Sequence, residues 1–152
     1  TNNEVDYREQ VDIGTERAAI VDPSPFYWCL VGPNQWPEEA RLPGFQGIVL
    51  SFLEKLQAVA HRLLALMSAS LGLEPGHIGK VFGDQPQPYC KLIRYPPTPG
   101  GSRGVGAHKD SGFLTLLLQD EVGGLQARNI AGDWVEVHPR PGRPSHAHGH
   151  LW

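Results

Sequence analysis

The residues with the clearest chemical potential are His108 and Asp110, which are separated by a single lysine. Alternate residues of an extended strand point to the same side, so this spacing predicts that an imidazole nitrogen and a carboxylate oxygen can face one metal ion. Such a pair makes up two of the three ligands of a 2-His-1-carboxylate triad, which leaves positions open on a non-haem Fe(II). The alternative interpretation is a surface histidine that lies near an aspartate.

Short strands are predicted around this pair, within residues 88–137. The candidate strands cover 89–95, 113–118, 124–127 and 134–137. A glycine-rich loop, 99–106, separates the first strand from His108. Residues 129–133 include Gly132 and predict a hairpin turn between the last two strands. Strands at this spacing favour a β-sandwich or barrel.

One long amphipathic helix is predicted over residues 45–72. Its apolar side chains recur at helical spacing, namely Phe45, Ile48, Val49, Phe52, Leu53, Leu56, Val59, Ala60, Leu63, Leu64 and Met67. Gly44 precedes the helix, and Gly72 with Pro75 ends it. We expect this helix to buttress the strands by packing and to take no part in a site.

The residues before the helix, 1–44, are predicted to be loops with one short strand at 8–14. Prolines interrupt this region, and the residue before each proline is pushed out of the helical conformation. Tyr27, Trp28 and Trp36 are expected to anchor the loops. Long ordered loops in a small domain usually serve a site.

The last residues, 138–152, show no apolar alternation and predict a tail without a fold. We therefore expect one domain over 1–142 and a tail over 143–152. His146, His148 and His150 alternate in this tail and could bind a metal as a flexible histidine-rich tract. Ordering a flexible tail for that purpose costs about 1–2 kcal/mol per residue, which argues against it.

Composition excludes several classes of protein. The chain has 152 residues, 40% of them hydrophobic, and a net charge of −3, so it has no basic excess suited to nucleic acid or a membrane surface. No apolar run approaches the roughly 20 residues of a membrane span, and the first residues do not resemble a signal peptide. Cys29 and Cys90 do not form a disulfide framework, and a cytoplasmic protein with reduced thiols is expected.

Motifs from Lys91 to Pro141 resemble the 2-oxoglutarate/Fe(II)-dependent oxygenase family, in its isopenicillin-N-synthase-like branch. The matching pieces are Leu92-Ile-Arg-Tyr-Pro96, Gly104-Val-Gly-Ala-His-Lys-Asp110, Leu114-Thr-Leu-Leu-Leu-Gln-Asp120, Gly123-Gly-Leu-Gln126 and Gly132-Asp-Trp-Val-Glu-Val137. Their order and spacing are those of the family. Arg8-Glu-Gln-Val-Asp-Ile-Gly14 and Gly32-Pro-Asn-Gln-Trp-Pro37 also look like its upstream segments, so the resemblance covers about residues 4–142.

The resemblance implies a mainly β fold with flanking helices, a double-stranded β-helix or jelly roll. It implies an enzyme that uses Fe(II), O₂ and the co-substrate 2-oxoglutarate to hydroxylate, desaturate or cyclise a small molecule of secondary metabolism. His108 and Asp110 match the first two iron ligands. Tyr95 matches a tyrosine that contacts the 2-oxoglutarate carboxylate, or a substrate carboxylate in isopenicillin-N-synthase-like enzymes. The alternative is a tyrosine at the strand end that packs on the prolines after it. Many members have an asparagine two residues before this tyrosine, where the present chain has Ile93.

Part of the family pattern is missing from this sequence. The third iron ligand, a histidine, and the arginine and serine that bind the far carboxylate of 2-oxoglutarate would follow residue 142. The jelly roll is therefore expected to be incomplete at its C-terminus, through truncation or a shifted reading frame. Arg143 and Ser145 mimic the arginine and serine, but they come too early in the chain.

Three alternatives to a 2-oxoglutarate-dependent oxygenase remain at this point. One is an oxidase that resembles isopenicillin N synthase and needs no 2-oxoglutarate. Another is a catalytically incomplete jelly-roll fragment or binding module. The third is a sugar- or peptide-binding β-sandwich without a metal, against which the residues around His108 argue. The substrate cannot be named from residue types.

Overall fold

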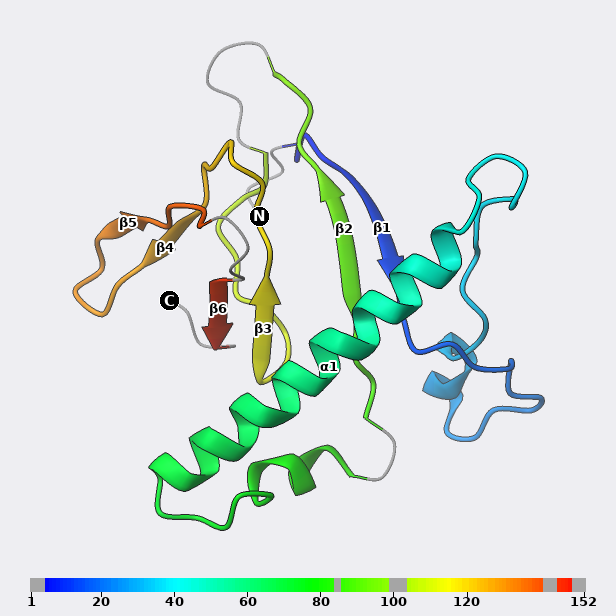
Figure 1. The fold of residues 1–152 in the computed structure, drawn as a ribbon, viewed down its shortest axis with the longest axis horizontal. Helices are drawn as coiled ribbons and strands as arrows, with labels where there is room; N and C mark the ends of the chain where they lie inside the picture. The colour runs from blue at the N-terminus through cyan, green and yellow to red at the C-terminus, as the bar shows by residue number, and fades with distance from the viewer. Residues whose placement is uncertain (1–4, 84–85, 99–103, 141–144, 149–152) are drawn as a thin grey trace. The chain divides into compact units, whose positions relative to one another are not determined.

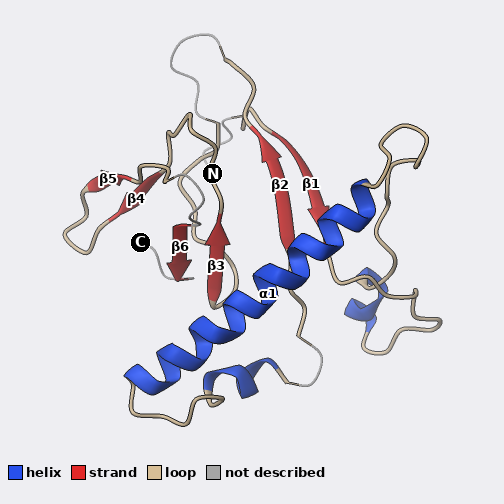
Figure 2. Ribbon diagram, in the orientation of Figure 1, coloured by secondary structure: helices blue, strands red, loops and turns tan. Residues whose placement is uncertain are grey.

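A computed structural model describes residues 5–83, 86–98, 104–140 and 145–148, the last four by their backbone alone. The chain divides into two compact units, Asp6–Gly104 and a second that begins at Val105 and also takes in the first residues. Figure 1 traces the chain, and Figure 2 separates the single long helix from the short strands.

Two antiparallel strands, β1 (Glu9–Ile13) and β2 (Cys90–Arg94), form the sheet of the first unit. Glu9 pairs with Arg94 and Ile13 with Cys90, so residues far apart in the sequence are joined along the whole length of both strands. Ile13 is buried, with 2% of its surface exposed, and it anchors one face of the sheet in the core. Both strands were predicted from the sequence, and the structure confirms them.

The long helix α1 (Phe45–Ser70) begins after Gly44, whose φ of 72° is a conformation that glycine adopts without strain. The short 3-10 helix η2 (Ile78–Phe82) folds back against it. Ser68 is fully buried between them, where its hydroxyl donates to the Leu64 carbonyl (2.9 Å) and accepts from the Ile78 amide (3.2 Å). The predicted helix is confirmed.

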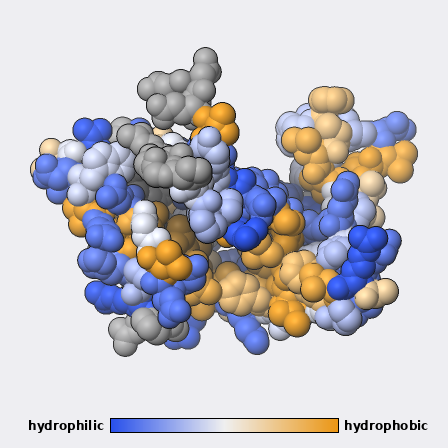
Figure 3. Space-filling model, turned by 90° about the horizontal axis from the view of Figure 1, so that it is seen from above, coloured by the Kyte–Doolittle hydropathy of each residue, from blue (hydrophilic) through white to orange (hydrophobic). Residues whose placement is uncertain are grey.

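The predicted apolar stripe of α1 is only partly buried. Val49 and Leu64 are buried, but Ile48, Phe52 and Val59 are exposed. Ser68, near the C-terminal end of the helix, is where η2 contacts α1. Exposed apolar side chains also occur elsewhere, as Figure 3 shows by the orange groups among the blue ones.

The loops before α1 are held by a small polar cluster. The Asn34 side chain exchanges two hydrogen bonds with the backbone of Gly14 (2.9 and 3.0 Å) and donates to Glu16 (2.7 Å). The Trp36 indole also donates to Glu16 (3.0 Å), and its ring meets Phe45 edge-on at 6.2 Å. Trp36 therefore anchors its loop, as expected. Tyr27 lies in η1 (Phe26–Leu30) against Trp28 but remains exposed.

The second unit contains two strand pairs. β4 (Gln126–Arg128) and β5 (Trp134–Glu136) form the predicted hairpin, closed by the turn at 129–133. The Asp133 amide donates to the Asn129 side chain (2.8 Å), and Gly132 has a φ of 96°. These contacts explain why the turn forms where the sequence predicts it.

β3 (Leu114–Leu117) pairs antiparallel with β6 (Ser145–His148), with Leu116 opposite His146. The expectation of a tail without a fold is therefore wrong for Ser145–His148. The apolar pattern could not reveal this strand, because the pairing uses backbone groups that every residue carries. Leu118, just after β3, is exposed.

No helix among the described residues is long and apolar enough to cross a membrane.

Candidate metal centre

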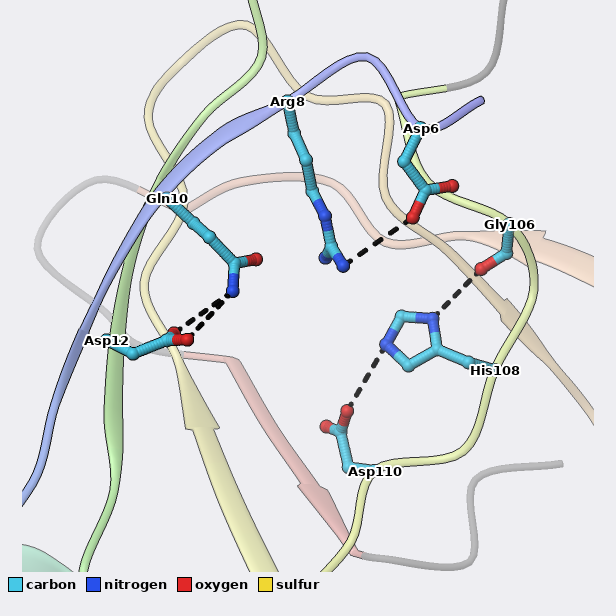
Figure 4. Close-up of polar contacts among 7 residues, drawn as sticks. All are labelled: Asp6, Arg8, Gln10, Asp12, Gly106, His108 and Asp110. Atoms are coloured by element: carbon cyan, nitrogen blue, oxygen red, sulfur yellow. Dashed lines mark hydrogen bonds and ion pairs between the residues drawn. The ribbon is translucent and has the colours of Figure 1, made fainter. Parts of the chain in front are cut away.

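His108 and Asp110 approach each other in the segment that leads into β3. The Nε2 atom of His108 lies 3.4 Å from an Asp110 carboxylate oxygen, and each side chain is roughly half exposed. The Nδ1 atom of His108 lies 2.9 Å from the Gly106 carbonyl oxygen. Figure 4 shows the imidazole ring between these two partners. The sequence-predicted pair is therefore brought together, with both side chains open to solvent.

The Gly106 contact determines which imidazole nitrogen is available. A carbonyl oxygen can only accept, so Nδ1 must carry the proton in this hydrogen bond. In the neutral ring Nε2 then keeps a lone pair, which faces the Asp110 carboxylate. Two electron-rich atoms this close are unfavourable unless a positive charge, either a proton or a metal cation, lies between them.

The donor pair fits a transition metal. Two donors that each lie about 2.1 Å from one ion at a right angle are about 3.0 Å apart, close to the distance between His108 Nε2 and Asp110. A ligating histidine commonly donates its other N–H to a backbone carbonyl, which is the arrangement at Gly106. The residues present are thus compatible with an N,O-ligated metal.

The local backbone differs from the prediction in one respect. Residues 106–113 are an irregular segment, and β3 begins only at Leu114. The pair converges because the Gly106 hydrogen bond holds the ring, not because a regular strand aligns alternate side chains. Sequence reasoning missed this role of Gly106, although the Gly-x-Gly before the histidine was a visible signal.

Tyr95 follows β2 in the first unit, with half of its surface exposed. Its ring packs closely against the backbone of Gly104, where an added Cβ would lie 2.5 Å from the ring. Only glycine fits at that position without displacing the tyrosine. The Gly104 contact limits where the Tyr95 hydroxyl can lie, and the sequence had not indicated it.

Among the described side chains, no third metal donor lies with His108 and Asp110. No group of three or more histidine, cysteine, aspartate or glutamate residues that could hold a metal occurs among them. The backbone of β6 places His146 and His148 at alternate positions of one strand, whereas Arg143 and His150 lie outside the described residues. His138 is exposed, 3.9 Å from Glu136.

The chain matches the 2OG-Fe(II) oxygenase superfamily over residues 86–148. It is 31% identical to the 2-oxoglutarate-dependent dioxygenase frbJ of a Dothideomycetidae species, over 93% of this chain and 39% of that protein. It is also 38% identical to flavone synthase of Petroselinum crispum, over 72% of this chain and 30% of that protein. The chain belongs to this superfamily, and it spans about 40% of the length of the first relative.

Solved structures agree with this assignment. The fold matches a full-length Neurospora crassa protein solved in complex with alpha-KG, with a TM-score of 0.80 and 25% identity, over 98% of this chain and 45% of that one. A 2OG-Fe(II) oxygenase family protein from Caulobacter crescentus matches with a TM-score of 0.76, 27% identity, 97% of this chain and 46% of that one. The strands described above are thus part of a jelly roll, as the sequence predicts.

Proposed function

We propose that this chain supplies the metal-binding region of an Fe(II)- and 2-oxoglutarate-dependent dioxygenase. In this proposal His108 and Asp110 are iron ligands, and Tyr95 contacts the 2-oxoglutarate carboxylate. The whole protein hydroxylates, desaturates or cyclises a small organic molecule. The observation that supports the proposal most directly is the 3.4 Å separation of His108 and Asp110, with the imidazole held by Gly106.

Fe(II) with 2-oxoglutarate and O₂ supplies the oxidising chemistry, and the chain binds and orients these groups. The Gly106 carbonyl holds the proton on Nδ1 and leaves Nε2 of His108 free to donate to a metal. The Asp110 carboxylate brings a negative charge that offsets part of the charge of a divalent cation. Two protein ligands leave most coordination positions to other donors.

The remaining parts of the proposal concern substrate and location. A small organic substrate is supported by the similar proteins, among them a flavanone 3-dioxygenase of Petroselinum crispum and a Neurospora crassa protein solved with alpha-KG and thymine. The net charge of −3 does not favour a nucleic-acid partner. A cytoplasmic location is supported by two free cysteines, Cys29 and Cys90.

The direct test is an anaerobic Fe(II) titration of the chain, with and without 2-oxoglutarate, followed by visible absorption. We expect the weak band of an Fe(II)–2-oxoglutarate chelate, its loss in His108→Ala, and its retention in His138→Ala, an exposed histidine of the same unit. Tyr95→Phe should weaken 2-oxoglutarate binding and leave metal binding unchanged. The absence of a band, or a band that survives His108→Ala, would overturn the proposal.

A further inference from the structure

The two members of the donor pair are held in place in different ways. The His108 ring is oriented by the hydrogen bond between its Nδ1 atom and the Gly106 carbonyl oxygen (2.9 Å). Within the described part of the chain, the Asp110 carboxylate has a polar contact with His108 and with no other group. Figure 4 shows this carboxylate beside the imidazole ring. Since no second side chain or backbone amide holds it, the position of Asp110 depends on its own backbone.

The backbone after Asp110 bends before β3 begins. Residues 111–113 form the bend, and Leu114 is the first residue of β3. Ser111 and Gly112 are exposed, so burial does not hold these two residues in place. The strand that follows is fixed by its antiparallel pairing with β6. The torsion angles of the bend therefore determine where Asp110 lies relative to the strand.

Gly112, in the middle of this bend, has a φ of 111°. Residues with a side chain rarely adopt such an angle, because their Cβ then crowds the backbone, whereas glycine adopts it freely. Apart from its chain neighbours, a Cβ added at Gly112 would meet no atom within 4 Å. A larger residue would therefore be opposed by backbone strain and not by a neighbouring group. A change of φ would relieve that strain and would redirect the chain that leads back to Asp110.

We infer that Gly112 is a positioning residue of the proposed metal centre, and that its positive φ directs the Asp110 carboxylate toward Nε2 of His108. The inference rests on the proposed function, because it takes Asp110 as a metal ligand. The two donors are then set independently, since a carbonyl oxygen orients the histidine and a backbone torsion angle orients the aspartate. Loss of a group that orients a metal ligand commonly lowers metal affinity about 10- to 100-fold.

The test compares the full chain with three variants. Gly112→Ala disfavours the positive φ in the bend. Gly124→Ala is the matched control, because Gly124 lies in the same unit, has a φ of 97° and also has open space for a Cβ. Ser111→Ala is a second control, since it removes an exposed side chain from the same bend and leaves Gly112 in place. Thermal melting should show similar losses of stability in the two glycine variants, because both are strained in the same way.

Two readouts separate positioning from stability. The first needs no metal and is the nuclear Overhauser contact between the His108 ring protons and the Asp110 β-protons. The second is the affinity for Mn²⁺, measured from the electron paramagnetic resonance signal of the free ion. We expect Gly112→Ala to lose the Overhauser contact and to bind Mn²⁺ roughly tenfold more weakly than the parent chain. Gly124→Ala and Ser111→Ala should keep both the contact and the affinity.

An Overhauser contact that survives in Gly112→Ala, or that is absent from the parent chain, would overturn the inference. Loss of the contact in Gly124→Ala as well would also overturn it, because reduced stability would then explain the effect. If the parent chain binds Mn²⁺ and Gly112→Ala binds it equally well, the inference is again wrong. If the contact behaves as expected but the parent chain binds no Mn²⁺, the proposed function fails, whereas the orientation of Asp110 by Gly112 is supported.

Discussion

At the scale of single residues, the orientation of one imidazole ring brings the two proposed metal donors together. The Gly106 carbonyl holds Nδ1 at 2.9 Å and thereby turns Nε2 toward Asp110. The sequence predicts that His108 and Asp110 converge, because their spacing and surrounding motif are informative. It could not predict the carbonyl contact, since a backbone oxygen has no residue type to mark it.

Gly104 should be sensitive to substitution, because Tyr95 packs against its backbone. A Cβ in Gly104→Ala would lie 2.5 Å from the Tyr95 ring and would force the ring to move. We expect a loss of about 1–3 kcal/mol in unfolding free energy and weaker 2-oxoglutarate binding. Gly76→Ala is the control, since an added Cβ there meets nothing within 4 Å. Urea denaturation checks both variants, and equal stability of Gly104→Ala and the parent chain would refute the packing role.

Glu16 should make folding stability depend on acid pH. Hydrogen bonds from Asn34 and Trp36 lower its pKa below the ordinary 4.5. A lowered folded-state pKa contributes stability above the unfolded pKa, and this contribution is lost as pH falls through the folded value. The parent chain should therefore lose more stability than Glu16→Gln between about pH 5 and pH 3. Chemical denaturation at several pH values tests this, and parallel curves would argue against it.

At the scale of elements, α1 is predicted well because its apolar period is long and glycine stands at its start. Only one of the two strand pairs in the second unit is predicted from the sequence. β4 and β5 follow from their hairpin turn, whereas β6 has no apolar alternation and is defined only by its backbone pairing with β3. The burial of α1 was overestimated because periodicity marks an apolar face without saying how much of it is covered.

The contact between α1 and η2 should depend on Ser68. Its buried hydroxyl accepts from the Ile78 amide, so Ser68→Ala leaves that amide without its partner. We expect a loss of about 1–3 kcal/mol in unfolding free energy. Ser70→Ala is the matched control, because Ser70 is exposed and donates to the Met67 carbonyl. If both variants melt at the same temperature, the buried hydrogen bond does not stabilise the contact.

At the scale of the whole molecule, family membership follows from the order of several short motifs more than from any one of them. The sequence predicts a jelly roll and a donor pair, and the fold comparison supports the jelly roll over 98% of the chain. The family resemblance places the third ligand after residue 142, and this stays a prediction, because the described residues contain no group of three donors that could hold a metal. The substrate could not be predicted either, because the residue types along the chain do not specify a ligand.

The central claim is that His108 and Asp110 bind a metal ion together. The most direct measurement is a titration of the ¹⁵N-labelled chain with Mn²⁺, an ion that suits nitrogen and oxygen ligands and broadens the signals of nearby nuclei. We expect selective broadening of residues 106–112 at substoichiometric Mn²⁺ and its loss in His108→Ala and Asp110→Asn. Uniform broadening, or broadening centred on His138 or β6, would contradict the claim.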